Sequence, residues 1–198
     1  MGKSDIKSLV GFIYNLSLLE EETFQLYKNI AEKVDFPLIK ALLTEISLDS
    51  KKHFQLLKGI IDSMPKVDLN TKDAQKKFSE TQKSMSNFLS YFVDVPKINE
   101  NNLPDLIGKL SRLEGQMSEE YEILVQAKSV VFFASEMDRN YQFKSENFKK
   151  IFEKIISDET RHNEILGTIE DIIHQKDKEL LAKDPLLYYR RMGVPRAP

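Results

Sequence analysis

The segment FEKIISDETRHNEILGTIEDII, residues 152–173, decides the fold of this chain. Its apolar residues recur at intervals of three or four, which is the period of one face of an α-helix. The apolar members of this face are Phe152, Ile155, Ile156, Leu166, Ile169 and Ile173. Two polar residues, Glu159 and His162, lie in the middle of the same face. A helix that buries this face therefore also buries a carboxyl group and an imidazole, and each of them needs a partner there.

Three further segments have the same helical period, so the sequence predicts four long helices and an all-α fold. The first spans about residues 5–34, and the second begins at Pro37, because a proline suits the first turn of a helix. The second ends at Met64-Pro65, and the third begins after Asn101-Asn102, a pair suited to capping a helix. Helices of this length are typical of an elongated bundle.

The lengths of the connections predict how the helices are joined. Few residues separate the first two helices, and the last two are joined around residues 137–140, so each pair should form an antiparallel hairpin. Residues 65–102 form a long crossover, in which residues 78–92 have the pattern of an additional amphipathic helix. We expect one domain over residues 1–182, with helix added at its C-terminal end, and a tail over residues 183–198.

Composition excludes several classes of protein. The 198 residues are 41% hydrophobic and 30% charged, which suffices for a buried core and a solvated surface. Cysteine is absent, which excludes disulfides, thiolate metal sites and a cysteine nucleophile. The formal net charge of −2 gives no general attraction to nucleic acid or anionic lipid, and no apolar run reaches the ~18 residues of a membrane span. We expect a cytoplasmic protein that binds neither nucleic acid nor membranes.

The other three helices also carry a titratable residue on their apolar face. Glu20 interrupts the first apolar stripe, His53 the second and Glu114 the third. A buried carboxylate without a partner is costly, so it usually neutralises or binds a cation. Four helices that each place Glu or His near mid-length therefore indicate a metal site. On the third helix, Glu120 lies on an alternative stripe and competes with Glu114 for this role.

A short motif occurs twice in the chain. DSKKH at residues 49–53 aligns with DETRH at residues 158–162, and an apolar pair follows each of them. The repeat relates the second helix to the fourth and aligns His53 with His162. It also aligns Ser50 with Glu159, so the two copies differ at one position that bears on chemistry.

The first and third helices are related in the same way. Glu20 precedes Tyr27 by seven residues, and Glu114 precedes Tyr121 by seven. The midpoint between Glu20 and His53 falls at the turn that precedes the second helix, and the midpoint between Glu114 and His162 falls in the turn of the second hairpin. Folding each hairpin should therefore bring its glutamate level with its histidine.

One glutamate from each of two helices and Glu-x-x-His from the other two resembles the di-iron carboxylate arrangement of ferritin-like proteins. The chain is similar to the rubrerythrin group of that superfamily over residues 5–175. The resemblance implies a ferritin-like four-helix bundle that holds one or two ions of iron, or of manganese. The implied metal ligands are Glu20, His53, Glu114, Glu159 and His162. The resemblance also implies that Asp49 and Asp158 orient the histidines.

Ser50 departs from the family pattern, because it stands where the second motif requires a glutamate. Two functions from different classes follow from this departure. One is an iron-dependent oxidoreductase that acts on oxygen or peroxide. The other is a non-catalytic binding or interaction bundle with a decayed di-iron site. The apolar clusters at residues 78–92 and 186–189 suit core or dimer contacts, and we expect a homodimer.

Overall fold

The computed structural model describes residues 3–63, 98, 102–126 and 145–183. These residues contain four α-helices and a single isolated β-bridge. The helices are α1 (Lys3–Lys33), α2 (Pro37–Asp62), α5 (Leu103–Gln126) and α7 (Ser145–Lys183). The prediction of an all-α four-helix bundle is confirmed.

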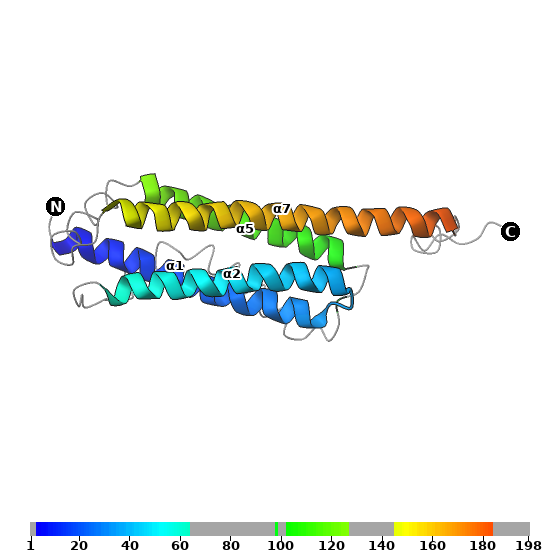
Figure 1. Ribbon diagram of the computed structural model, residues 1–198, viewed down its shortest axis with the longest axis horizontal. Coiled ribbons are helices and arrows are strands. Elements are labelled where there is room, and N and C mark those ends of the chain that lie inside the picture. The colour runs from blue at the N-terminus through cyan, green and yellow to red at the C-terminus, as the bar shows by residue number, and fades with distance from the viewer. Residues whose placement is uncertain (1–2, 64–97, 99–101, 127–144, 184–198) are drawn as a thin grey trace.

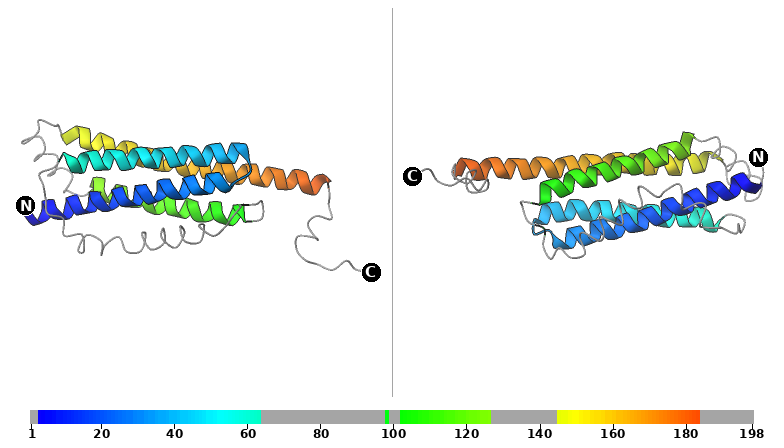
Figure 2. Two further views of the ribbon diagram at one scale, coloured as in Figure 1. Left: turned by 90° about the horizontal axis from the view of Figure 1, so that it is seen from below. Right: turned by 180° about the vertical axis from the view of Figure 1, so that it is seen from behind.

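The four helices lie side by side as two antiparallel pairs, α1 with α2 and α5 with α7 (Figures 1 and 2). The C-terminal part of α7 extends beyond the ends of the other three helices (Figure 1). Helix α2 ends at one end of the bundle, whereas α5 begins at the other end. The end of α2 and the start of α5 therefore lie at opposite ends of the bundle. The helix predicted at residues 78–92 and the turn at residues 137–140 lie outside the described residues.

The turn between α1 and α2 follows from its sequence. Phe36 has extended backbone angles (φ −85°, ψ 111°), as a residue before proline prefers, and Pro37 is the first residue of α2. The Phe36 carbonyl accepts a hydrogen bond of 2.8 Å from the Lys40 backbone. Beside this turn, Ile98 pairs with Val34 in the β-bridge and donates its backbone N–H to the Lys33 carbonyl at 3.0 Å. These contacts hold the chain near the start of α5.

The apolar core consists of two clusters. The larger cluster surrounds the α1–α2 turn, and its most buried members include Leu26, Ile30 and Leu43. The smaller cluster lies toward the other end of the bundle and includes Ile13 and Phe152. All four helices contribute to a band of buried polar residues near the boundary of the two clusters, and on α2 and α7 this band falls between them. Apolar packing on both sides thus isolates this band from solvent, and the fold places it near the middle of the bundle.

No helix among the described residues has both the length and the apolar character needed to cross a bilayer.

Candidate metal centre

The band of buried polar residues contains one or two titratable side chains from each helix. Glu20 comes from α1, His53 from α2, Glu114 from α5, and Glu159 and His162 from α7; each of the five is 0% exposed. Each of these residues lies on the apolar face of its amphipathic helix, so packing the four faces together drives all five into the interior. The structure therefore brings together every residue that the sequence analysis selected.

The five side chains form two groups that share Glu159. Glu20, His53 and Glu159 place one ligand atom each within 4.8 Å of one another, and so do Glu114, His162 and Glu159. Ligand atoms on opposite sides of a small divalent cation lie about 4.2 Å apart, twice a bond of about 2.1 Å. Each group therefore has the dimensions of a cation site.

Glu159 lies between the two histidines. Its Oε1 atom is 3.3 Å from Nδ1 of His53, and its Oε2 atom is 3.6 Å from Nδ1 of His162. The same Nδ1 atoms lie 3.3 Å from Glu20 Oε1 and 3.0 Å from Glu114 Oε2, respectively. Both imidazoles thus direct Nδ1 toward the carboxylates, and each glutamate is level with the histidine of its own hairpin.

The other nitrogen of each histidine faces an aspartate on the opposite helix. His53 Nε2 on α2 lies 3.0 Å from Asp158 Oδ2 on α7, and His162 Nε2 on α7 lies 3.5 Å from Asp49 Oδ2 on α2. A carboxylate in this position fixes the orientation of a ligand histidine and makes it more basic. The sequence did not predict that each histidine would pair with the aspartate of the other helix, because each motif contains an aspartate of its own.

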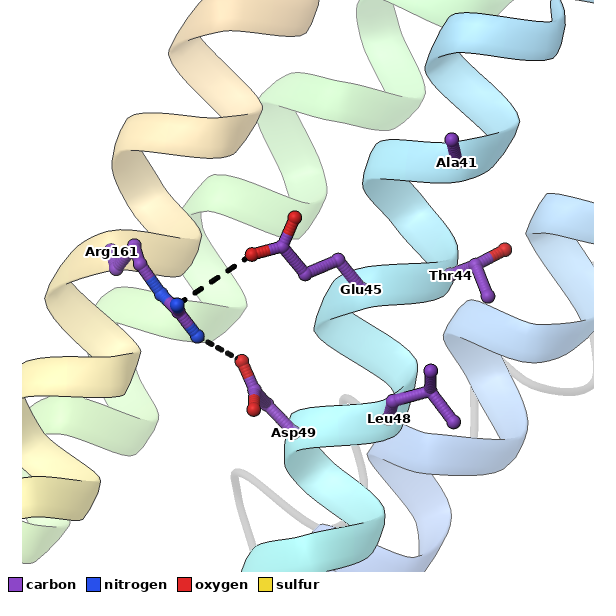
Figure 3. Close-up of a pocket in the computed structure, with 6 residues that line it drawn as sticks. All are labelled: Ala41, Thr44, Glu45, Leu48, Asp49 and Arg161. Atoms are coloured by element: carbon purple, nitrogen blue, oxygen red, sulfur yellow. Dashed lines mark hydrogen bonds and ion pairs between the residues drawn. The ribbon is translucent and has the colours of Figure 1, made fainter.

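Two basic side chains, Lys52 and Arg161, form ion pairs with these aspartates on the outer side of the bundle. Lys52 binds both, at 2.6 Å from Asp49 Oδ1 and 2.8 Å from Asp158 Oδ2. Arg161 reaches from α7 across to Asp49 and to Glu45 on α2, and Figure 3 shows its guanidinium between these two side chains. The carboxylates of Asp49 and Asp158 therefore join buried histidines to half-exposed cations. The sequence analysis did not predict that Lys52 and Arg161 bind these aspartates. The one signal for this role was that each basic residue immediately precedes a histidine of the repeated motif.

The two tyrosines of the repeat also lie at the centre, and both are 0% exposed. Tyr121 on α5 donates a 2.5 Å hydrogen bond to Glu20 Oε1 on α1. On the opposite side, burial raises the pKa of Tyr27 well above its usual value, and the nearby Glu114 carboxylate raises it further. Each tyrosine thus reaches from one hairpin toward the glutamate of the other.

The carboxylates change the protonation of both histidines. Burial alone would lower the pKa of His53, but the carboxylates of Glu159 and Glu20, each 3.3 Å from its Nδ1 atom, outweigh it and raise the pKa to about 10. His162 behaves in the same way beside Glu114 and Glu159, which raise its pKa to about 11. Without a metal ion, the imidazoles therefore carry protons at neutral pH, and a bound cation would replace them.

The carboxyl groups divide according to their surroundings. Burial, followed by the charges of Glu114 and Glu20, raises the pKa of Glu159 to about 8. Glu114 is equally buried, but hydrogen bonding and charge from His162 lower its pKa. Glu159 thus lies near the negative charges of both other glutamates. This is the position expected of a carboxylate that is shared by two cation sites.

The hydrogen bonding of the centre fits a metal. Several buried ligand atoms have no hydrogen-bond partner, among them Glu20 Oε2, Glu114 Oε1, both carboxylate oxygens of Glu159, and His53 Nδ1. Buried polar atoms are nearly always paired in proteins, so unpaired acceptors gathered around one point indicate a missing partner. Divalent cations bound by these oxygens and by the Nδ1 atoms would satisfy them.

The structure places Glu114, rather than Glu120, in the centre. Glu114 is fully buried beside His162, whereas Glu120 is only half-buried and belongs to neither group. We expect Glu114→Gln to weaken the binding of one ion by about 100-fold or more, because it removes a charged ligand. Glu120→Gln should leave metal content unchanged. Elemental analysis of the two variants after loading with iron(II) checks this, and equal losses would contradict the assignment.

The antiparallel bundle and its paired Glu/His groups define a protein of the ferritin-like class, in which carboxylates and histidines on facing helices hold metal. The Rubrerythrin family model matches residues 17–169, which includes all five residues of the centre. The chain therefore belongs to the rubrerythrin family. Comparison with the curated proteins and with the solved structures returned no match.

Proposed function

We propose that this protein binds two iron ions at the buried centre and uses them to reduce peroxide or dioxygen. The observation that supports this proposal is the pair of Glu/His groups that share Glu159. A carboxylate common to two cation sites is the feature that distinguishes a dinuclear centre from two separate ones. The proposed ligands are Glu20, His53, Glu114, Glu159 and His162.

The donor set favours iron. A set of carboxylate oxygens and imidazole nitrogens suits iron or manganese. Magnesium prefers ligands that are all oxygen, and structural zinc sites are tetrahedral with four nitrogen or sulfur ligands. Each proposed ligand histidine also has an aspartate at its second nitrogen, as ligand histidines usually do. Family membership supports the same metal, since di-iron binding is typical of rubrerythrins.

The chemistry matches the number of ions. Two iron(II) ions supply two electrons, which together with two protons reduce one hydrogen peroxide to two waters, or one dioxygen to one hydrogen peroxide. The chain contributes the surroundings: the apolar clusters on both sides exclude bulk water, and Glu20 and Glu114 hold the ions in pairs with His53 and His162. Tyr121 fixes Glu20 through its hydrogen bond.

A second function is favoured by one residue. Ser50, at 1% exposure, occupies the buried position where a fourth carboxylate would bind the ions. A centre with three carboxylates could hold metal without turning over, and the protein would then be a binding bundle rather than an enzyme.

Iron loading separates the two functions. Under anaerobic conditions, we expect two iron(II) ions per chain by elemental analysis, followed by oxidation when one equivalent of hydrogen peroxide is added. Oxidation is measured by the appearance of near-ultraviolet absorption and by peroxide consumption. Loading without accelerated oxidation, or the absence of bound iron, contradicts the oxidoreductase and supports the non-catalytic binding or interaction bundle.

A further inference from the structure

Ser50 is buried without a hydrogen-bond partner. Its side chain lies on the buried face of α2, one turn before His53, and its Oγ atom has no partner within the described part of the chain. A hydroxyl group so placed loses its hydrogen bonds to water and gains none in return. Among the unpaired atoms of the centre, the carboxylate oxygens can only accept, whereas the hydroxyl groups of Ser50 and Tyr27 can both donate and accept. Ser50 is therefore able to donate a hydrogen bond to an anion bound beside it.

The internal repeat shows what is missing beside Ser50. Ser50 precedes His53 by three residues, as Glu159 precedes His162 by three. Glu159 extends its carboxylate between both histidines, with 3.3 Å and 3.6 Å to their Nδ1 atoms. A glutamate at position 50 would extend toward the same point from α2. Serine ends at Oγ, so this chain supplies no second carboxylate from position 50.

The net charge of the centre with two metal ions bound indicates whether a further ligand would be negative or positive. Two divalent cations carry four positive charges, whereas Glu20, Glu114 and Glu159 supply three negative ones once the histidines are neutral. One positive charge would then remain in an interior from which water is excluded. An unpaired buried charge is strongly unfavourable, so the centre has a place for one more negative charge.

We propose that a small monocarboxylate from solution, of the class of formate, acetate or bicarbonate, binds beside Ser50 and replaces the fourth carboxylate. The Ser50 hydroxyl donates a hydrogen bond to this anion. A carboxylate suits the position better than a single-atom anion, because its two oxygens match the group that Glu159 presents from α7. This inference rests on the proposed function, since the anion binds only where the cations are present.

Anion and metal must then bind cooperatively. A ligand that binds only the metal-loaded protein tightens the binding of metal, and the effect is reciprocal. At an anion concentration ten times its own dissociation constant, the apparent affinity for metal should rise about tenfold.

Titration with cobalt(II) sulfate, in a buffer free of carboxylates and chloride, measures this effect. Metal affinity and the visible spectrum of bound cobalt are recorded with and without formate, acetate, bicarbonate or chloride. We expect the carboxylates to tighten cobalt binding and to change its spectrum, and chloride to do neither. Which carboxylate binds most tightly identifies the ligand.

Two variants locate the anion. Ser50→Glu supplies the carboxylate within the chain, so added formate should no longer affect cobalt affinity. Ser50→Ala keeps the space but removes the donor, so formate should still act, with weaker affinity. Should Ser50→Glu not fold, the weakened formate effect in Ser50→Ala locates the site alone.

The outcomes separate the two proposals. Cobalt binding that no anion alters would overturn the anion site and leave the metal centre intact. An undiminished formate effect in both Ser50 variants would place the anion elsewhere and overturn the assignment to Ser50. Failure of the parent protein to bind any divalent metal would overturn the proposed function itself.

Discussion

We expect Glu159→Gln to abolish the binding of both proposed metal ions, whereas substitution of any other single ligand should impair mainly one. Glu159 belongs to both Glu/His groups, and its two oxygens lie near different histidines. The amide keeps the shape of the side chain but removes its charge and reduces the oxygens available to cations from two to one. We expect the metal content of the variant to fall from two ions per chain to nearly none, as measured by elemental analysis.

The metal-free variant should remain folded. Burial and the neighbouring carboxylates raise the pKa of Glu159 to about 8, which favours its protonated form when no metal is bound. Glutamine resembles this protonated form, so the circular dichroism of the metal-free variant should match that of the metal-free parent.

Glu164→Gln is the matched control, because Glu164 lies on the same helix but is exposed. Its metal content should equal that of the parent protein. Equal metal loss in the two variants would mean that Glu159 is not the shared ligand.

We expect Ser50→Glu to have opposite effects on stability with and without metal. In the metal-free protein, it adds a fourth carboxyl group to a site that already contains three, and burying this group without a cation should cost about 3 kcal/mol of unfolding free energy. In the loaded protein, the new carboxylate completes the coordination and neutralises the remaining positive charge. The melting temperature of the variant should therefore lie below that of the parent without metal and above it with metal.

Thermal unfolding with and without iron(II), under anaerobic conditions, measures this difference. Ser47→Glu is the control: Ser47 is also buried on α2, one turn earlier, but its hydroxyl donates to the Phe24 carbonyl at 3.1 Å. A glutamate there should destabilise both forms, and metal should not rescue it. If metal leaves the melting temperature of Ser50→Glu unchanged, Ser50 does not lie beside a metal site.

Much of the fold and the centre could be predicted from the sequence, because both depend on periodicity. The apolar stripes specify four amphipathic helices, and a polar residue within a stripe is carried into the core with it. The repeat of DSKKH and DETRH showed that the two hairpins are related. In each hairpin the glutamate and the histidine are equally far from the turn, which predicted that the two side chains lie at the same level of the bundle. Ser50 was visible as the position at which the copy in the second helix lacks the glutamate of the copy in the fourth.

The contacts between hairpins were decided only by the tertiary structure. The sequence left Glu114 and Glu120 as alternatives, since they lie on overlapping stripes less than two turns apart, and the rotation of α5 against α7 buries only Glu114. The exchange of aspartates, with Asp158 on His53 and Asp49 on His162, depends on the separation of α2 and α7. Spacing along a chain specifies which face a residue shares, but the packing of one helix against another specifies which side chain it meets.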